Sequence, residues 1–245
     1  MTDTDTDRTA FVLTGTAGSG EAVVRTVAEA GGTVGFTYND SSEQAEELLA
    51  DLPGEGHEAW QCDVTEAGAT ADVVDEAFET LGAIDALVYT VGVISSATVG
   101  EVDPEAWANH LDANVTGAVN VLRAATPHLE EQGDGAVVAL SASDGIIRND
   151  GLSAYDASKK GLEALVQEAA RELGPHGVRA NVVAPGFIRD PDAISGEQRE
   201  ELLEQLPYKR VTRPQDVADV ALYLCSDDAA TVTGAVVPAD SGLAL

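Results

Sequence analysis

The stretch TGTAGSG at Thr14–Gly20 decides the fold, because it joins a short apolar run to an amphipathic segment. The apolar run Ala10–Thr14 is typical of a buried strand, and Glu21–Ala30 has the periodicity of a helix. Glycines at such a turn let the backbone approach a diphosphate closely, and the start of the helix offers free N–H groups. The stretch therefore predicts a nucleotide site that includes Gly15, Gly18 and Gly20, although a merely tight turn would use the same glycines.

Short apolar runs alternate with longer amphipathic segments along the rest of the chain. The expected strands are Ala10–Thr14, Thr33–Tyr38, His57–Cys62, Ala86–Tyr89, Ala136–Leu140, Arg179–Val183 and Ala235–Pro238. The expected helices are Glu21–Ala30, Ser42–Leu52, Ala69–Leu81, Pro104–Leu129, Leu152–Leu173 and Pro214–Leu224. This alternation predicts an α/β fold, a single doubly wound Rossmann-type domain over residues 9–245. Its parallel sheet would have seven strands, with helices on both faces.

Two segments depart from this alternation. Residues 1–8 form an acidic leader that we expect to be disordered. The segment Arg189–Thr212 interrupts the rhythm of strands and helices and is interpreted as a lid beside the site. Neither segment resembles a linker that would divide the chain into two domains.

The charge balance excludes several classes of function. The chain has 43 acidic residues against 13 basic ones, a net charge of -30, and the lysines are confined to Lys159, Lys160 and Lys209. Binding to nucleic acid or to an anionic membrane needs a basic face, so neither partner is expected. No apolar run is long enough to cross a membrane, the leader is no signal peptide, and two cysteines form no disulfide framework. We therefore expect a cytoplasmic protein.

The ends of the second and third expected strands offer further nucleotide contacts. A carboxylate at the end of the second strand would bind the ribose 2′-hydroxyl of NAD, whereas arginine would accommodate the phosphate of NADP. Tyr38 is neither, and its neutrality favours NADP slightly, although Asn39 and Asp40 supply no cation. Asp63, which is followed by Val64, fits a contact to an adenine amino group, but an aspartate there also serves as a turn or helix cap.

A tyrosine and a lysine stand four residues apart in YDASK, Tyr155–Lys159. On a helix this spacing places both side chains on one face. A phenol with a pKa of roughly 10 is a poor acid at neutral pH, and a nearby ammonium group lowers that pKa. Because the chain contains only two other lysines, the pair indicates acid–base chemistry rather than an ordinary surface helix.

With this pair, the chain resembles the short-chain dehydrogenase/reductase family, and within it the 3-oxoacyl thioester reductases. The resemblance runs from about Thr9 to Leu245. Its landmarks are Thr14-Gly15, Asp63-Val64, Asn114 in NVTG, Tyr155-x-x-x-Lys159, Asn181–Gly186, Asp216-Val-Ala and Val232-Thr-Gly234. The family implies NADP or NAD as cofactor and hydride transfer between the nicotinamide and a carbonyl or alcohol carbon of a small molecule.

The resemblance also implies roles for single residues. Tyr155 would protonate the carbonyl oxygen, Lys159 would hold the nicotinamide ribose and lower the pKa of Tyr155, and Asn114 would anchor a water in the proton relay. The other implied cofactor contacts are Gly92, Pro185, Gly186 and Ile188. Family members pair long helices between subunits, and Asn114–Leu122 and Leu162–Leu173 are apolar enough to suggest a homodimer or homotetramer.

Several family positions are altered in this chain. The glycine loop is one residue shorter, and the serine that polarises the substrate carbonyl is Ala142, flanked by Ser141 and Ser143, either of which could replace it. Loss of one such donor typically costs about 100- to 1000-fold in rate. Further changes occur at Val91, Asp190 and Ser241. The alternative to an active enzyme is therefore a catalytically impaired member that acts as a nucleotide sensor or an oligomer partner.

The remaining residues with reactive side chains suggest no second chemistry. The histidines, His57, His110, His128 and His176, lack metal-ligand spacing and are interpreted as surface or cap residues. Cys62 and Cys225 have no basic neighbours in the sequence to activate a thiolate and are expected to be buried apolar residues.

The net charge of -30 leads to the first prediction, that the protein comes from a halophile. Self-repulsion destabilises a compact chain of this charge unless counterions screen it. We expect the melting temperature, measured by circular dichroism, to rise steeply from dilute buffer to molar KCl. A melting temperature that does not change over this range contradicts the prediction and favours the alternative, an acidic surface that binds a basic partner.

Overall fold

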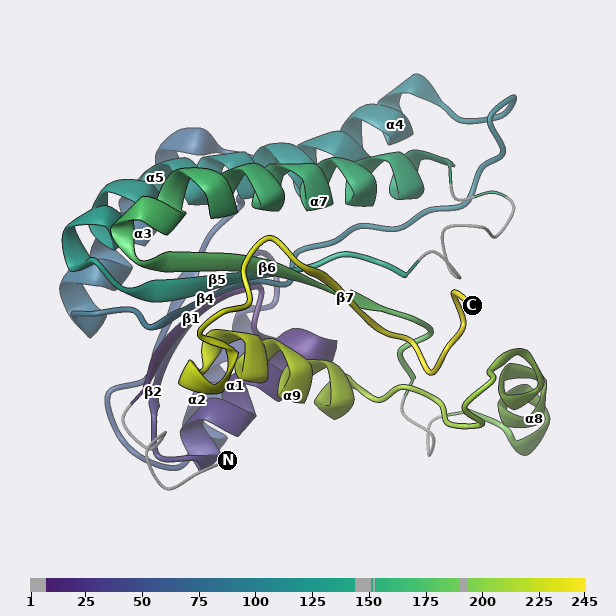
Figure 1. Ribbon diagram of the computed structural model, residues 1–245, viewed down its shortest axis with the longest axis horizontal. Helices are drawn as coiled ribbons and strands as arrows, with labels where there is room; N and C mark the ends of the chain where they lie inside the picture. The colour runs from purple at the N-terminus through teal and green to yellow at the C-terminus, as the bar shows by residue number, and fades with distance from the viewer. Residues whose placement is uncertain (1–7, 144–150, 152, 190–193) are drawn as a thin grey trace.

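The computed structural model describes residues 8–143, 151, 153–189 and 194–245, so the predicted leader, except Arg8, lies outside the described residues (Figure 1). The described strands form one parallel sheet in the order β3-β2-β1-β4-β5-β6-β7. Their bounds are β1 Thr9–Leu13, β2 Thr33–Tyr38, β3 Glu58–Gln61, β4 Ala86–Tyr89, β5 Gly135–Leu140, β6 Val178–Pro185 and β7 Val236–Ala239. All seven predicted strands and the parallel doubly wound topology are confirmed.

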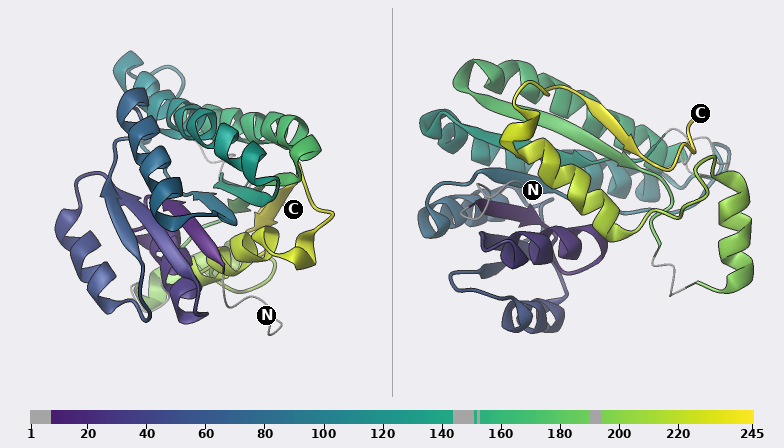
Figure 2. Two further views of the ribbon diagram at one scale, coloured as in Figure 1. Left: turned by 90° about the vertical axis from the view of Figure 1, so that its left-hand side faces the viewer. Right: turned by 60° about the horizontal axis from the view of Figure 1, so that its bottom comes forward.

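Helices cover both faces of this sheet, as Figures 1 and 2 show. On one face lie α3 (Ala67–Leu81), α5 (Gly117–Gln132) and α7 (Ser153–Leu173). On the other face lie α1 (Gly18–Glu29), α2 (Ser42–Asp51) and α9 (Pro214–Cys225). Because successive side chains of a strand point to opposite faces, Val137 and Ala139 of β5 pack toward α5 and α7, whereas Val138 and Leu140 pack toward α1 and α9.

One predicted helix is interrupted. The expected helix Pro104–Leu129 is instead α4 (Pro104–Leu111), a π-helical turn at Asp112–Thr116, and α5. A π turn is rare and often marks a functional site, because the extra residue re-aims the side chains around it. Here it carries Asn114, which is fully buried. The hydrophobic period of the sequence does not reveal such a turn, because the apolar stripe continues through it.

The segment Arg189–Thr212 contains a helix that the sequence pattern does not predict, α8 (Gly196–Gln205). Its first turn is stabilised by a capping box in which the Ser195 hydroxyl accepts from the backbone N–H of Gln198. None of its residues is buried, and it stands beyond the carboxyl ends of the strands (Figure 1). The weak apolar stripe of α8 explains why no helix was expected there.

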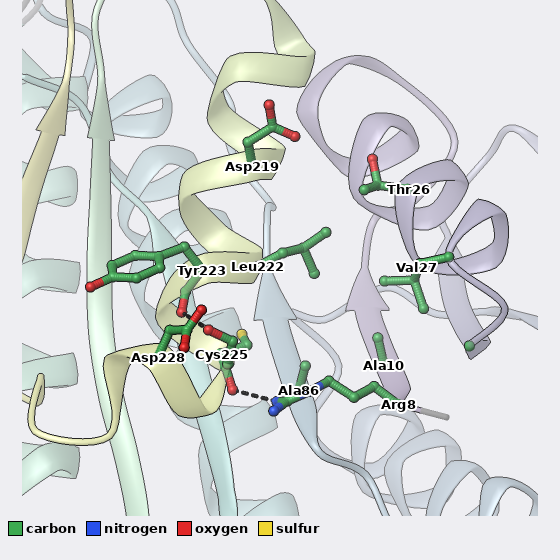
Figure 3. A pocket seen from close by; sticks show the side chains of 13 residues that line it. Arg8, Ala10, Thr26, Val27, Ala86, Asp219, Leu222, Tyr223, Cys225 and Asp228 are labelled. Carbon is green, nitrogen blue, oxygen red and sulfur yellow. Dashed lines mark hydrogen bonds between the residues drawn. The ribbon is translucent and has the colours of Figure 1, made fainter. Parts of the chain in front are cut away.

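Cavities lie at both ends of the sheet. At the amino ends of the strands, a cleft of about 420 Å³ separates α1 from α9, with Val27 and Leu222 among its apolar walls (Figure 3). Arg8 crosses its floor and donates to the backbone oxygen of Cys225 at 2.7 Å. The second cavity, at the carboxyl ends, is the predicted site. Among the described helices, none is both long and apolar enough to span a membrane.

Candidate active site

A crevice of about 470 Å³ opens at the carboxyl ends of β1, β4, β5 and β6. The neighbouring strands β1 and β4 leave the sequence order at this point, which is where doubly wound sheets bind ligands. Its walls bring together the glycine loop, the loop after β4, the end of β5 and the start of α7. Among the residues that line it are Ser19, Gly20, Ile94, Ala142, Tyr155 and Lys159.

The glycine loop has the geometry of a diphosphate cradle. Helix α1 begins at Gly18, whose φ is +56°, and Ala17 before it provides no side-chain cap, so the first N–H groups of the helix lack a side-chain acceptor. A Cβ on Gly20 would lie 2.1 Å from the carbonyl oxygen of Thr14, so only glycine fits there. The Ser19 hydroxyl is buried with no hydrogen-bond partner among the described residues. These free donors fit an anionic group held by the backbone.

The adenosine contacts expected from the sequence lie outside the lining of this crevice. Gly15 packs against Phe36, which a Cβ would approach to 2.6 Å, and its N–H donates to Thr37. Tyr38 is half-buried at the end of β2. One oxygen of Asp63 accepts from both the N–H and the hydroxyl of Thr65, which is the turn role considered above, and Val64 is buried in the core.

The first turns of α7 place Tyr155 and Lys159 together in the crevice. The Lys159 side chain is 3% exposed, and its ammonium nitrogen donates to the backbone oxygens of Val91 at 3.2 Å and Leu140 at 3.0 Å. The same nitrogen lies 5.8 Å from the centroid of the Tyr155 ring. The predicted pairing of the two side chains on one helical face is therefore present, and the lysine faces the crevice rather than bulk solvent.

The electrostatics of this pair differ from the sequence-based expectation. Burial raises the pKa of Tyr155 to about 12, and the nearby charge of Asp156 adds to that rise. Burial also lowers the pKa of Lys159 to about 8. Desolvation disfavours the charged form of each group, and it is the largest cause of both shifts. The expected lowering of the tyrosine pKa is therefore not found in the protein alone, and the Tyr155 phenol keeps its proton near neutral pH.

Asn114 connects the π turn to the loop after β4. Its side-chain oxygen accepts from the N–H of Val93 at 2.8 Å, and its side-chain nitrogen donates to the carbonyl of Val93 at 3.1 Å and to the Ser158 hydroxyl at 2.8 Å. Ser158 in turn donates to the backbone oxygen of Tyr155 at 2.7 Å. Asn114 thus braces the loop against the helix that carries the tyrosine.

The three residues after β5 determine which side chain could donate a hydrogen bond to a substrate carbonyl. The N–H groups of Ser141 and Ser143 both donate to β6, so the extended strand geometry continues through them. Ala142 lines the crevice without a donor. The Ser141 hydroxyl donates to the buried carboxylate of Glu163 at 2.7 Å, and that carboxylate also accepts from Lys160 at 2.9 Å. The Ser143 hydroxyl is buried with no partner among the described residues.

The remaining expected contacts lie along one wall. Pro185, Gly186 and Ile188 line the crevice together with Phe187 and Arg189. A Cβ on Gly186 would lie 2.9 Å from Asp240, and one on Gly92 would lie 3.0 Å from the Lys159 nitrogen. Both glycines therefore allow a close approach of backbone to side chain. Asp190, the altered family position beyond Arg189, lies outside the described residues.

Two of the four histidines are not surface residues, contrary to the expectation. His57 and His110 are buried, whereas His128 and His176 lie near carboxylates at the surface. A lone histidine gives no burial signal in a sequence, because only its partners in space decide whether its nitrogens can be satisfied away from water. Both cysteines are buried, as expected.

A family model described as Enoyl-(Acyl carrier protein) reductase matches residues 15–244, nearly the whole chain. The chain belongs to the short-chain dehydrogenase/reductase family. It is therefore a member of an oxidoreductase family, and the crevice with Tyr155 and Lys159 lies where the sequence resemblance places the family's site.

Curated relatives and solved structures agree with this membership. The chain is 31% identical to a 3-oxoacyl-[acyl-carrier-protein] reductase FabG of Staphylococcus aureus, over 96% of this chain and 98% of that protein. It is 32% identical to a cis-4-hydroxycyclohexanecarboxylate dehydrogenase of Sinomonas cyclohexanicum, over 96% of each. A solved short-chain type dehydrogenase/reductase from Mycobacterium ulcerans matches with a TM-score of 0.89 and 31% identity, over 97% of this chain and 90% of that chain.

Burial of Lys159 leads to a prediction about stability and pH. The unfolded lysine binds its proton below about 10.5, whereas the folded one does so only below about 8, so between these values the unfolded state binds more protons. Stability must therefore rise with pH in this window. From pH 8 to pH 10, where Tyr155 does not yet oppose it, we expect wild type to gain on the order of 2 kcal/mol relative to Lys159→Met, measured by denaturant unfolding in molar KCl. Parallel pH profiles for the two proteins would contradict a buried ammonium.

Proposed function

We propose that this protein is an NAD(P)H-dependent oxidoreductase that reduces the carbonyl group of a small molecule, such as a 3-oxoacyl thioester or a similar ketone. The observation that carries the proposal is the buried Lys159 ammonium beside the Tyr155 ring, in the crevice that the glycine loop also lines. A charge that costs several kcal/mol to bury needs a reason, and chemistry in the crevice supplies one. The FabG relatives support the choice of a 3-oxoacyl substrate.

In the proposed reaction, Tyr155 gives its hydroxyl proton to the carbonyl oxygen. A bound nicotinamide dinucleotide would supply the hydride that the carbonyl carbon receives in this step. The raised pKa of Tyr155 keeps the proton on the phenol until the carbonyl oxygen becomes basic, and Lys159 stabilises the phenolate that remains. The carbonyl oxygens of Val91 and Leu140 fix the position of the ammonium, so it does not have to reorganise during proton transfer.

The residues present fit the proposed dinucleotide. The free N–H groups at the start of α1 and the Ser19 hydroxyl would hold its diphosphate, and Gly92, Pro185, Gly186 and Ile188 would border its nicotinamide end. We propose NADP in preference to NAD, because Tyr38 is uncharged at the position where a carboxylate would select NAD. Titration of intrinsic fluorescence with NADPH and NADH in molar KCl measures the preference directly.

We also propose that the protein forms a homodimer or homotetramer through α4, α5 and α7. Trp107 on α4 and Val119 on α5 are apolar, and they are 38% and 41% exposed in the monomer. Association would remove both from water. Light scattering of the purified protein in molar KCl distinguishes the monomer from either assembly.

Replacement of Tyr155 by phenylalanine tests the acid. We expect Tyr155→Phe to lower kcat for an acetoacetyl thioester by at least about 100-fold, because the proton donor is lost, while binding of the nicotinamide nucleotide is retained. Tyr223→Phe removes an exposed phenol from α9, outside the crevice (Figure 3), and is the matched control, with activity close to wild type. A Tyr155→Phe protein that keeps most of its rate would exclude Tyr155 as the acid.

Restoring a hydroxyl at position 142 tests the missing donor. We expect Ala142→Ser to raise kcat by up to about 100-fold, because a hydroxyl at this lining position can donate to the carbonyl oxygen. Ser141→Ala is the comparison, because the Ser141 hydroxyl already donates to Glu163. An unchanged rate for Ala142→Ser would instead implicate Ser141, Ser143 or no donor. If nucleotide binds but neither wild type nor Ala142→Ser turns over any carbonyl, the chain is the impaired sensor or oligomer partner.

A further inference from the structure

Two side chains one helical turn apart hold the backbone of the loop after β4. The side-chain oxygen of Asn114 accepts a hydrogen bond from the N–H of Val93 at 2.8 Å, and its side-chain nitrogen donates one to the carbonyl oxygen of Val93 at 3.1 Å. Four residues earlier in the chain, the Nε2 atom of His110 accepts a hydrogen bond from the N–H of Ser95 at 3.0 Å. The loop is therefore fastened to the α4 and π-turn segment at alternate residues, 93 and 95.

The hydrogen bonds of His110 identify which of its two ring nitrogens carries the hydrogen. Its Nδ1 atom lies 2.7 Å from the backbone oxygen of Ala106, which can only accept, so Nδ1 carries the proton. Nε2 is then the bare nitrogen that accepts from Ser95. His110 is 3% exposed, so both ring nitrogens are satisfied inside the protein. An apolar residue here would leave the Ser95 N–H without its acceptor on the helix and would release this part of the loop.

Holding residues 93 and 95 against the helix determines where the residue between them points. Ile94 is 62% exposed, and it lines the crevice together with Gly92 and Tyr155. A large apolar side chain thus lines the same crevice as Tyr155, the residue that would donate the proton. Its contribution is to exclude water from, and make apolar contact with, whatever lies beside Tyr155.

We propose that His110 is a positioning residue which, with Asn114, fixes Ile94 as the apolar wall that selects carbonyl substrates carrying an alkyl group. This rests on the proposed function for its substrate, but the fastening of the loop does not. His110 touches no reacting atom and acts through Ser95 and Ile94. The selected class is a ketone or 3-oxoacyl compound with several carbons beside the carbonyl, in preference to a small or charged one.

Hydrogen–deuterium exchange tests the fastening without any turnover. In His110→Leu the Ser95 N–H loses its acceptor, and we expect exchange in the peptide spanning 91–96 to quicken by about tenfold or more. His110→Gln keeps an acceptor and should restore slow exchange. His57→Leu is the matched control, because His57 is also buried and accepts an N–H, from Val34 at 3.2 Å, at the other side of the sheet. Unchanged exchange in His110→Leu, or equal acceleration in His57→Leu, would overturn the role of His110.

Steady-state kinetics test the consequence for selectivity. For 3-oxoacyl thioesters of increasing alkyl length, we expect Ile94→Ala to lower kcat/KM of the longer substrates by about tenfold through KM, with little change for the shortest. His110→Leu should show the same pattern and His110→Gln should resemble wild type. A uniform loss across all chain lengths, or a loss in kcat alone, overturns the selective role. If wild type reduces no carbonyl, the proposed function and the selectivity fail together, while the exchange experiment still decides the fastening.

Discussion

The site depends on one buried charge, the ammonium of Lys159. It is held by the backbone oxygens of Val91, just after β4, and Leu140, at the end of β5, so a single group joins two strand ends to α7. Removing an ammonium group from water costs several kcal/mol of free energy, and hydrogen bonds to two neutral carbonyl oxygens offset only part of this penalty. The lowered pKa of Lys159 reflects this unfavourable desolvation of the ammonium group. The remainder of the fold must supply the stability, which it does through the apolar side chains on both faces of the sheet.

Much of this architecture follows from local pattern. The strands are short apolar runs bounded by turn residues, and the glycine loop and the Tyr155–Lys159 spacing are contiguous along the chain, so residue order alone is enough to predict them. The π turn at Asp112–Thr116, the burial of His110 and the bond from Ser141 to Glu163 are not predictable in this way. Each of these depends on which backbone or side-chain groups meet in space, across 15 to 22 residues of chain for the two hydrogen-bonded pairs, and periodicity carries no information about such meetings.

The acidity of the chain sets a constraint on any anionic cofactor. With a net charge of -30, the long-range field repels a dinucleotide. Salt screens that field beyond about 10 Å at 0.1 M, but it leaves short-range donors largely intact. The crevice uses donors of the short-range kind: the first N–H groups of α1, the Ser19 hydroxyl, and the cations Lys159 and Arg189 among its described lining residues. Under the proposed function, such a site would bind its dinucleotide better in high salt, in line with the halophile prediction from the composition.

The residues that follow β5 differ in role, because successive side chains of an extended segment point to opposite sides. Ser141 and Ser143 share one face of the extended segment, and Ser141 is bound to Glu163 on α7, whose carboxylate is also paired with Lys160. That bond fastens β5 to the helix bearing Tyr155. Ala142, between them, lines the crevice together with Ser141 but has no side-chain donor. To donate to a substrate, the Ser141 hydroxyl would have to leave Glu163, and this buried carboxylate would then lose one of its partners. Local geometry thus favours Ser141 as a residue that joins β5 to α7, and under the proposed function the polarisation of the substrate would fall to Tyr155 and Lys159.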